Sequence, residues 1–435
     1  MDHEAKQATK AKRTSVWNVK ISGVALWMYL IMLVVLAVVT YMHKLPGGIL
    51  GITLLLVLLG HLFYFIGERI PIINTYLGGG SVFTIFAAAA MATFGVIPAD
   101  VVSNTSSFIS GAGFLDFYIA ALIVGSILGM NRTLLLRAAV RFIPVALISM
   151  IFAFFAVGLV GTLIGYGFGH SVMFVSLPMM AGGIGAGVVP LSSIYGHALG
   201  QSSASMISQL IPASALGNVF AIIGAALLAK FGKDTKADGH GVLMEIDPKY
   251  TKPRAINLDI TQMGVGLMLA LTFFMAGTIF NAIFPKIHTY AFIIILVIIC
   301  KAFNLLPEYY EDSAVMFNQL VVSNLTHAVL AGIGIAMLNL GLLAKALTWQ
   351  FVVLVLTSII VITVASAIFG KLFGLYPLES SITAGLINNS MGGTGNVAVL
   401  SASKRMNLIA FAQMGNRLGG AIILVIAGIL IQFLH

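Results

Sequence analysis

One stretch near the C-terminus combines residue types suited to binding an anion in an apolar environment. It reads Asn388-Asn389-Ser390-Met391-Gly392-Gly393-Thr394-Gly395-Asn396. The apolar helix predicted after this stretch carries Arg417 near its middle. An unpaired guanidinium at bilayer depth is costly, so it is expected to face a cavity or an anion. Glycine lets backbone N–H groups approach a ligand closely, and a run of N–H groups attracts anions. Together these features predict a carboxylate site.

Each feature also has a purely structural explanation. Glycines in membrane helices permit close helix packing, and an arginine can snorkel to the interface or pair with a buried acid. Arg417 lies about ten residues from either end of its predicted span, or about 15 Å along a helix axis. That depth disfavours snorkelling, and the planar guanidinium fits a carboxylate. We therefore assign Arg417 to the substrate.

The glycine-rich run occurs twice. The segment 182–192 recurs at 392–401, and each copy is followed by a short polar stretch and a helix. Five predicted spans separate equivalent points of the two copies, so the second copy is expected to be upside down relative to the first. Such inverted repeats, with broken segments meeting near the midplane, are typical of secondary transporters. The predicted substrate-binding residues are Arg417, Gly182, Gly183, Gly185, Gly392, Gly393, Thr394, Gly395 and Asn389.

Neutral polar side chains surround the second run. Asn388, Ser390 and Asn416 could hold a coupling sodium ion through oxygen atoms, as unwound segments of transporters do. Hydrogen bonding between helices explains these residues equally well, so both interpretations stay open. His61 and His327 also lie in predicted spans. A membrane histidine can relay protons, but a hydrogen-bonded structural histidine is more common.

Composition places this chemistry in a membrane. The chain has 435 residues, of which 59% are hydrophobic and 9% charged. A soluble domain of this size could not cover so much apolar surface, which predicts an all-α polytopic membrane protein. The formal net charge of +9 comes from short segments between apolar runs, which indicates topology and not a nucleic-acid partner. With Cys300 as the single cysteine, no internal disulfide can form. We expect no metal or cofactor beyond a coupling sodium ion or proton.

Hydropathy predicts about eleven transmembrane helices. They lie near residues 22–42, 49–67, 79–97, 112–130, 139–166, 204–229, 260–284, 288–306, 315–340, 349–373 and 406–434. Two pieces rich in glycine, proline and serine, at about 173–200 and 378–403, are predicted to form re-entrant hairpins.

The chain is expected to divide around a basic central segment. The predicted parts are a cytoplasmic tail (1–21), an extra N-terminal helix (22–42), a first inverted repeat (49–229), a cytoplasmic linker (230–259) and a second repeat (260–435). Because basic residues favour the cytoplasmic side, the N-terminus is expected inside and the C-terminus outside.

The phrases MGGTGNVAVLSASKRMNLIAFAQMGNRLGGA and AGGIGAGVVPLSSIYG resemble the bacterial 2-hydroxycarboxylate transporter family. The extra N-terminal span and the basic central loop extend the likeness over nearly the whole chain. The resemblance implies a homodimeric inner-membrane carrier of citrate, malate or lactate, with two inverted five-helix repeats, a hairpin in each, and a transport domain that moves like an elevator. It places the family's hairpin glycines on the six glycines named above and its carboxylate-binding arginine on Arg417.

The chain departs from the family pattern at Met391. Sodium-coupled citrate carriers of the family place a second arginine immediately before the second glycine pair. Losing that cation favours the relatives that accept malate, citrate and lactate and exchange a divalent precursor for a monovalent product. The positions of any sodium ligands are then in question.

These observations predict a secondary active transporter of malate or citrate that exchanges it for lactate. The alternative is a sodium- or proton-coupled symporter of these acids, or of glutamate as in the related glutamate–sodium carriers. A membrane enzyme would need a nucleophile within reach of a base, and the sequence supplies no such pair. A channel agrees less well with an inverted repeat and two broken hairpins. The expected partners are a small carboxylate, the lipid bilayer and a second copy of the chain, with no nucleic acid.

Overall fold

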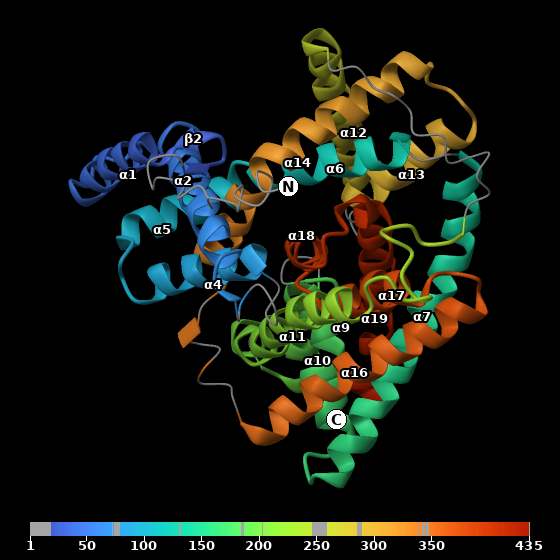
Figure 1. The fold of residues 1–435 in the computed structure, drawn as a ribbon. Coiled ribbons are helices and arrows are strands. Elements are labelled where there is room, and N and C mark those ends of the chain that lie inside the picture. The colour runs from blue at the N-terminus through green and yellow to red at the C-terminus, as the bar shows by residue number, and fades with distance from the viewer. Residues whose placement is uncertain are drawn as a thin grey trace, which may run out of the picture.

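The computed structural model describes residues 19–71, 73, 79–129, 132–183, 187–201, 203–245, 259–284, 289–338, 340–341, 344 and 348–434 (Figure 1). Helices dominate these residues. Two short strands, β1 (Lys20–Ile21) and β2 (Val24–Ala25), pair antiparallel immediately before the first helix.

The helices of the first half precede the central loop. They are α1 (Leu26–Tyr41), α2 (Gly51–Gly67), α4 (Gly79–Thr93), α5 (Ala99–Ser106), α6 (Phe114–Gly129), α7 (Arg132–Leu163), α8 (Phe168–Ser171), α9 (Leu177–Met180), α10 (Val189–Leu199) and α11 (Ser203–Phe231). A π-helical turn, η2 (Ser107–Gly111), joins α5 to α6, and a second, η3 (Val172–Ser176), joins α8 to α9.

The second half begins after the central loop. Its helices are α12 (Ile260–Ile283), α13 (Thr289–Ala302), α14 (Glu308–Met337), α16 (Trp349–Leu372), α17 (Pro377–Ser380), α18 (Gly393–Ala402) and α19 (Ile409–Leu434). Short turns η6 (Ser381–Gly385), η7 (Leu386–Asn389) and η8 (Met406–Leu408) connect the last three helices.

Within the described residues, seven helical stretches are long and apolar enough to cross a membrane. They are Ala99–Gly129, Leu135–Leu163, Gln209–Phe231, Ile260–Ile283, Glu308–Met337, Trp349–Leu372 and Met406–Ile431. Further apolar helices, such as α1 and α2, are shorter. The protein is therefore an all-α, multi-pass membrane protein.

Each of the eleven segments predicted to span the membrane contains a helix, although several bounds differ. The helix α7 begins at Arg132 and α14 at Glu308, each well before the predicted start. Hydropathy averages exclude charged residues, whereas a helix continues through them. In α14, Glu308 and Glu311 occupy the first turn, where negative charge interacts favourably with the helix dipole. The number of membrane crossings stays a prediction.

The helices pack in two groups (Figure 1). The α14 group contains α2, α4, α5, α6, α12, α13 and α14, and the α19 group contains α7 to α11 and α16 to α19. Each group draws helices from both halves of the chain. Both glycine-rich runs and Arg417 belong to the α19 group.

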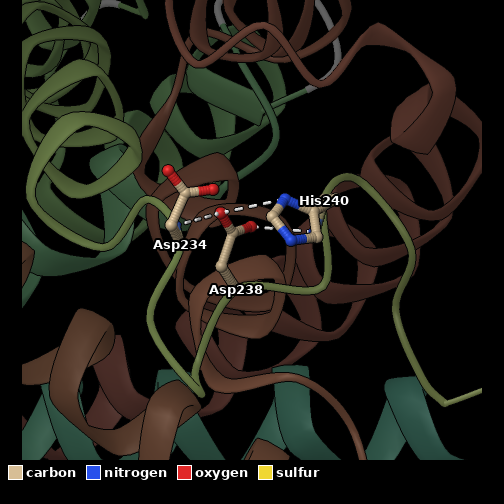
Figure 2. A group of neighbouring side chains, drawn as sticks. All are labelled: Asp234, Asp238 and His240. Carbon is tan, nitrogen blue, oxygen red and sulfur yellow. Dashed lines mark hydrogen bonds and ion pairs between the residues drawn. The ribbon is translucent and has the colours of Figure 1, made fainter.

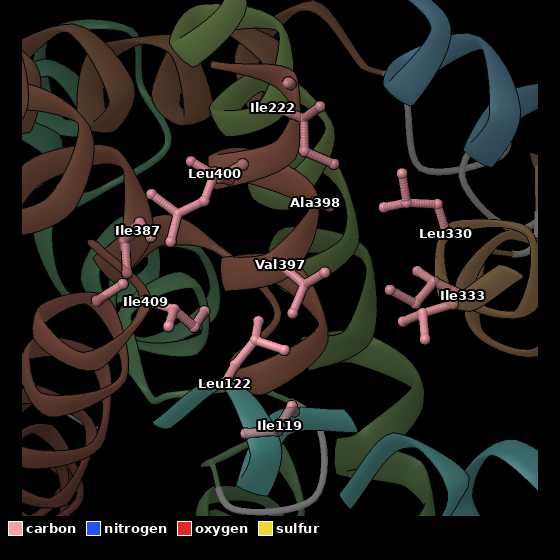
Figure 3. Packing of buried hydrophobic residues seen from close by; sticks show 14 of the residues in the cluster. Ile119, Leu122, Ile222, Leu330, Ile333, Ile387, Val397, Ala398, Leu400 and Ile409 are labelled. Carbon is pink, nitrogen blue, oxygen red and sulfur yellow. The ribbon is translucent and has the colours of Figure 1, made fainter. Parts of the chain in front are cut away.

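Apolar side chains fill the seam between the groups. Figure 3 shows part of one buried cluster that includes Val397 of α18 and Ile222 of α11 from one group, and Leu122 of α6 and Ile333 of α14 from the other. All four are almost completely buried. Because lipid tails are as apolar as these side chains, close packing and dispersion, and not removal from water, must hold the seam together.

Candidate functional site

Both glycine-rich runs lie where a helix breaks. The helix α9 ends at Met180, and Gly182 and Gly183 follow with φ of +88° and +102°. In the second half, η7 ends at Asn389, and Gly392 precedes α18 with φ of +75°. Residues with a side chain rarely adopt a positive φ, so these turns require glycine. The three residues belong to the predicted substrate site.

The two glycine turns touch each other through their backbones. A Cβ atom on Gly183 would lie 2.5 Å from the carbonyl oxygen of Met391, and one on Gly392 would collide with the carbonyl oxygen of Gly182. A turn of α19 closes the contact, since a Cβ on Gly420 would lie 2.6 Å from the carbonyl oxygen of Ala181. Three segments that are distant in the sequence therefore meet with no side chain between them.

The backbone of Arg417 lies in this same turn of α19, between Asn416 and Gly420. A Cβ on Gly182 would lie 3.2 Å from the backbone oxygen of Asn416 and 3.6 Å from its side-chain Oδ1. The turn that carries Arg417 thus packs against the first glycine turn. The side chains of Arg417 and Thr394, and Gly185 as a whole, lie outside the described residues.

The asparagine side chains around the turns are oriented by hydrogen bonds. Asn388 Nδ2 donates to the carbonyl oxygen of Ala384 at 2.7 Å, and Asn416 Nδ2 donates to that of Ile387 at 2.9 Å. Because a carbonyl oxygen can only accept, each amide is fixed with its Oδ1 pointing away from that bond. Asn389 Nδ2 lies 3.0 Å from Ser358 Oγ.

These orientations leave acceptor atoms without donors. Among the described residues, the Oδ1 atoms of Asn388, Asn389 and Asn416 are buried and have no hydrogen-bond partner. An unsatisfied buried acceptor costs about 1–3 kcal/mol, so several close together require an explanation. A donor on a ligand, such as a hydroxyl group, or a cation would satisfy them.

Ser390 and Asn218 have mainly structural contacts. The Ser390 hydroxyl lies 2.7 Å from the carbonyl oxygen of Ile387, which agrees with the structural interpretation of this residue. The N–H of Met391 donates to Asn218 Oδ1 at 3.1 Å, which ties α11 to the second glycine turn. Asn218 is not among the residues predicted from the sequence to form the site. The available signal was that Gly217-Asn218 stands at the position in the first repeat that matches Gly419-Gly420.

Glu379, the acid nearest to Arg417 in the sequence, is engaged elsewhere. Its Oε1 accepts from Arg405 Nε at 2.9 Å and from the N–H of Gly241 at 3.0 Å. Its Oε2 accepts from the N–H of Gly239 at 2.7 Å. Arg405 Nη2 also donates to Asp238 Oδ1 at 2.8 Å. Arg405 therefore lies in a buried ion cluster with two acids, Glu379 and Asp238.

The acid Asp238 lies in the central loop beside Asp234 and His240 (Figure 2). It accepts from the backbone N–H of His240 at 2.8 Å and of Asp234 at 3.1 Å. Burial raises the pKa of Asp238, but these hydrogen bonds and the charge of Arg405 outweigh burial and hold that pKa below its ordinary value. Since protein donors already engage its oxygens, Asp238 acts as a structural clasp between the loop and Arg405.

His61 and His327, named separately from the sequence, contact each other in the α14 group. Their Nδ1 atoms are 3.1 Å apart, which links α2 to α14. The ring of Tyr64 lies over His327, with 3.8 Å between ring centroids. This arrangement agrees with a hydrogen-bonded structural role for both histidines.

Comparisons with known proteins identify the family. The profile of the 2-hydroxycarboxylate transporter family matches residues 21–429. The malate transporter MleP of Lactococcus lactis subsp. lactis is 56% identical over 418 residues, which are 96% of this chain and 98% of that protein. The citrate transporter CitP of the same subspecies is 53% identical over 418 residues, 96% of this chain and 95% of the relative. The Na(+)-malate symporter of Bacillus subtilis is 36% identical over 425 residues, 96% and 94% of the two chains. The chain is a transporter, not an enzyme, and it belongs to the 2-hydroxycarboxylate transporter family.

Proposed function

We propose that this protein exchanges malate or citrate for lactate across the bacterial cytoplasmic membrane. The observation that carries the proposal is the backbone contact between the two glycine turns and the turn of α19 that carries Arg417. The contact brings the backbones of three segments together, without intervening side chains, beside the turn that carries Arg417. Such an arrangement suits a small anion that must be released again during each cycle.

The proposed substrates share a carboxylate next to a hydroxyl group. Arg417 would bind the shared carboxylate through its planar guanidinium. Backbone groups of both glycine-rich runs would complete the anion site. They belong to Gly182, Gly183 and Gly185 in the first run and to Gly392, Gly393, Thr394 and Gly395 in the second. The unsatisfied Oδ1 atoms of Asn389 and its neighbours would accept the substrate hydroxyl.

Two features favour exchange over ion coupling. Met391 provides no second cation for a tricarboxylate. The relatives at 56% and 53% identity are named for malate and citrate without an ion, whereas the one at 36% is named as a sodium symporter. The gradients of the two acids would drive an exchange, so the cycle would need no separate coupling ion. Exchange of a dianion for a monoanion would also move net charge across the membrane.

For the transport cycle we propose an elevator movement of the α19 group past the α14 group. The two groups would serve as transport domain and scaffold of a homodimer. Each group takes matching helices from both halves, as two inverted five-helix repeats would require. The largely apolar seam in Figure 3 supports the proposal, because apolar contacts can slide without losing directional bonds. The hydrogen bond between Ser81 of α4 and Ser401 of α18 would have to break during the movement. The proposed topology has eleven spans and two re-entrant hairpins, at 173–200 and 378–403. Its N-terminus lies inside the cell and its C-terminus outside.

A second candidate is sodium- or proton-coupled symport of malate, citrate or glutamate. The buried Oδ1 atoms of Asn388 and Asn416 favour it, since sodium prefers oxygen ligands of this kind. Ser390 could contribute its remaining lone pair. The sodium symporter among the relatives adds support.

Uptake of labelled malate by proteoliposomes separates the two candidates. The vesicles are preloaded with lactate, malate, citrate or buffer, and each condition is run with and without sodium. Exchange predicts rapid uptake that requires an internal acid and persists without sodium. Uptake into buffer-loaded vesicles that depends on sodium would replace exchange with symport.

Substitution of Arg417 tests the binding site itself. Arg417→Lys keeps the charge but loses the bidentate fork, so the apparent affinity for malate should fall by at least about tenfold, or about 1.4 kcal/mol. Arg417→Ala should abolish saturable uptake. The exposed Arg137 of α7 supplies the control, and Arg137→Lys should leave the affinity unchanged. Normal malate transport by a folded Arg417→Ala protein would place the carboxylate site elsewhere.

A further inference from the structure

A cavity lies between α11 and α16. It is a groove of about 470 Å³ with almost entirely apolar walls. Leu227 and Phe231 of α11 form one wall, and Ile360, Val364 and Ala367 of α16 form the other. Phe231, Ile360 and Val364 are 67%, 58% and 51% exposed, so the groove opens to the outside of the helix bundle. In a membrane protein, this outside is hydrocarbon.

One end of the groove is strongly basic. The helix α11 ends at Phe231 and α16 at Leu372, and Lys230 and Lys371 lie in their last turns. Lys371 follows Ala367 by one helical turn, so it continues the groove-lining face of α16. Lys230 Nζ lies 5.5 Å from the centre of the Phe231 ring.

Two further lysines come from the loop after α11. Lys233 follows Gly232 and Lys236 precedes Ala237, and both Gly232 and Ala237 line the groove. Asp234 lies 3.9 Å from Lys233 and offsets one of these charges. With Lys230 and Lys371, the basic end still carries a net positive charge.

The loop is anchored beside the groove. The carbonyl oxygen of Ala237 accepts from the N–H of Leu378 at 3.0 Å, and that of Leu243 accepts from the N–H of Tyr376 at 2.7 Å. Between these two hydrogen bonds, the loop is held by the buried ion pair of Asp238 with Arg405, whose charged atoms are 2.8 Å apart. The loop backbone next to Lys236 is therefore fixed relative to α17, and so is the position of this charge.

We propose that the groove binds one anionic phospholipid, with an acyl chain between α11 and α16 and its phosphate on the lysines. Charge complementarity along a single groove selects this occupant. A small anion would use the lysines but not the apolar walls, and a neutral lipid would use the walls but not the charge. Clusters of basic residues where helices leave a membrane attract anionic headgroups in this way. The groove shares no lining residue with the proposed carboxylate site, and its lipid binding does not depend on the proposed exchange.

Native mass spectrometry of the intact, delipidated protein tests the proposal. The probes are dioleoylphosphatidylglycerol and dioleoylphosphatidylcholine, which share acyl chains and differ in headgroup charge. The parent protein should retain more of the anionic lipid at equal concentration. Lys236→Gln/Lys371→Gln should lower that retention by at least about threefold and leave the neutral lipid unchanged. The matched control, Lys20→Gln/Lys44→Gln, removes two exposed lysines that do not line the groove, and retention should not change.

A second pair of variants tests the groove walls. Val364→Phe fills the groove and should reduce retention of the anionic lipid, whereas Ile368→Phe on the same helix should not. Thermal unfolding in detergent checks that every variant is folded. Equal retention of the two lipids by the parent, or equal losses in the test and control lysine pairs, would overturn the proposal. Anionic preference that survives both the lysine and the Val364 changes would place the lipid elsewhere and overturn it too.

Discussion

Met391 directly precedes Gly392 of the second glycine turn and contacts Gly183 of the first. Its backbone N–H is held by Asn218, and its carbonyl oxygen packs against Gly183. The residue is 8% exposed. A charge introduced here would therefore be poorly hydrated and would act strongly on an anion held by the turns.

Met391→Arg should shift selectivity toward citrate. The added attraction grows with the charge of the acid, whereas lactate has no second carboxylate to compensate for desolvation of the guanidinium. The measurement is the ratio of apparent inhibition constants of citrate and lactate against labelled malate, at one pH. Met391→Leu is the control for loss of the methionine without added charge. An unchanged ratio in a folded, active Met391→Arg protein would show that this position does not face the substrate.

At the residue scale, the sequence predicted positions better than partners. A glycine pair that occurs twice indicates that the backbone needs a conformation only glycine adopts easily. The structure shows this conformation as positive φ values at Gly182, Gly183 and Gly392. The bond from Met391 to Asn218 joins residues 173 positions apart. No local pattern predicts a contact over that distance, because it depends on how α11 packs.

At the scale of elements, the contact between the glycine turns should tolerate no side chain. Gly392→Ala places a Cβ against the carbonyl oxygen of Gly182 and requires an unfavourable backbone conformation, which costs about 1–3 kcal/mol. We expect loss of malate uptake with a lower Tm. Gly428→Ala, in α19 with open space around its Cβ, should have neither effect. Parent-like uptake by Gly392→Ala would show that the turns need not touch during transport.

The clasp between the central loop and Arg405 should respond to pH. Because the pKa of Asp238 is lowered on folding, its contribution to stability is present above the unfolded-state pKa, about 4, and is lost as pH falls through the lower folded-state value. Asp238→Asn should thus lower the unfolding free energy at pH 7 by about 1–3 kcal/mol. The difference from the parent should shrink below about pH 4.

Thermal unfolding in detergent between pH 7 and pH 3 measures this difference. Asp234→Asn is the control, because Asp234 is exposed and its ion pair with Lys233 is exposed on both sides. Its effect should stay within about 0.5 kcal/mol. A loss of stability in Asp238→Asn that is the same at every pH would show that the charge of Asp238 is not the cause.

Element bounds were less predictable than element types. Each apolar run that was predicted to span the membrane contains a helix. However, α7 and α14 begin earlier than predicted, because they extend through charged residues that a hydropathy average excludes. The clasp was not predictable from composition, since Glu379, Arg405 and Asp238 come from three separate segments.

At the scale of the whole molecule, each of the two helix groups contains helices from both halves of the chain. The turn of α19 that carries Arg417 contacts Gly182 of the first half, so the proposed site draws on both halves of the chain. Repetition in the sequence could suggest that the two runs meet. It could not predict that α18 would also pack against α4 and α14 of the other helix group.

The last prediction concerns the sides of the membrane from which the broken segments are reached. If the repeat is inverted, the end of α10 and the end of α18 must lie at opposite surfaces. Ala198 at the end of α10 and Lys404 after α18 are both exposed. In a Cys300→Ser background, Ala198→Cys should react with an impermeant thiol reagent in intact cells, and Lys404→Cys in inside-out vesicles. Residual labelling of the Cys300→Ser parent gives the baseline. Reaction of both variants from one side would contradict the inverted topology and, with it, the proposed elevator movement.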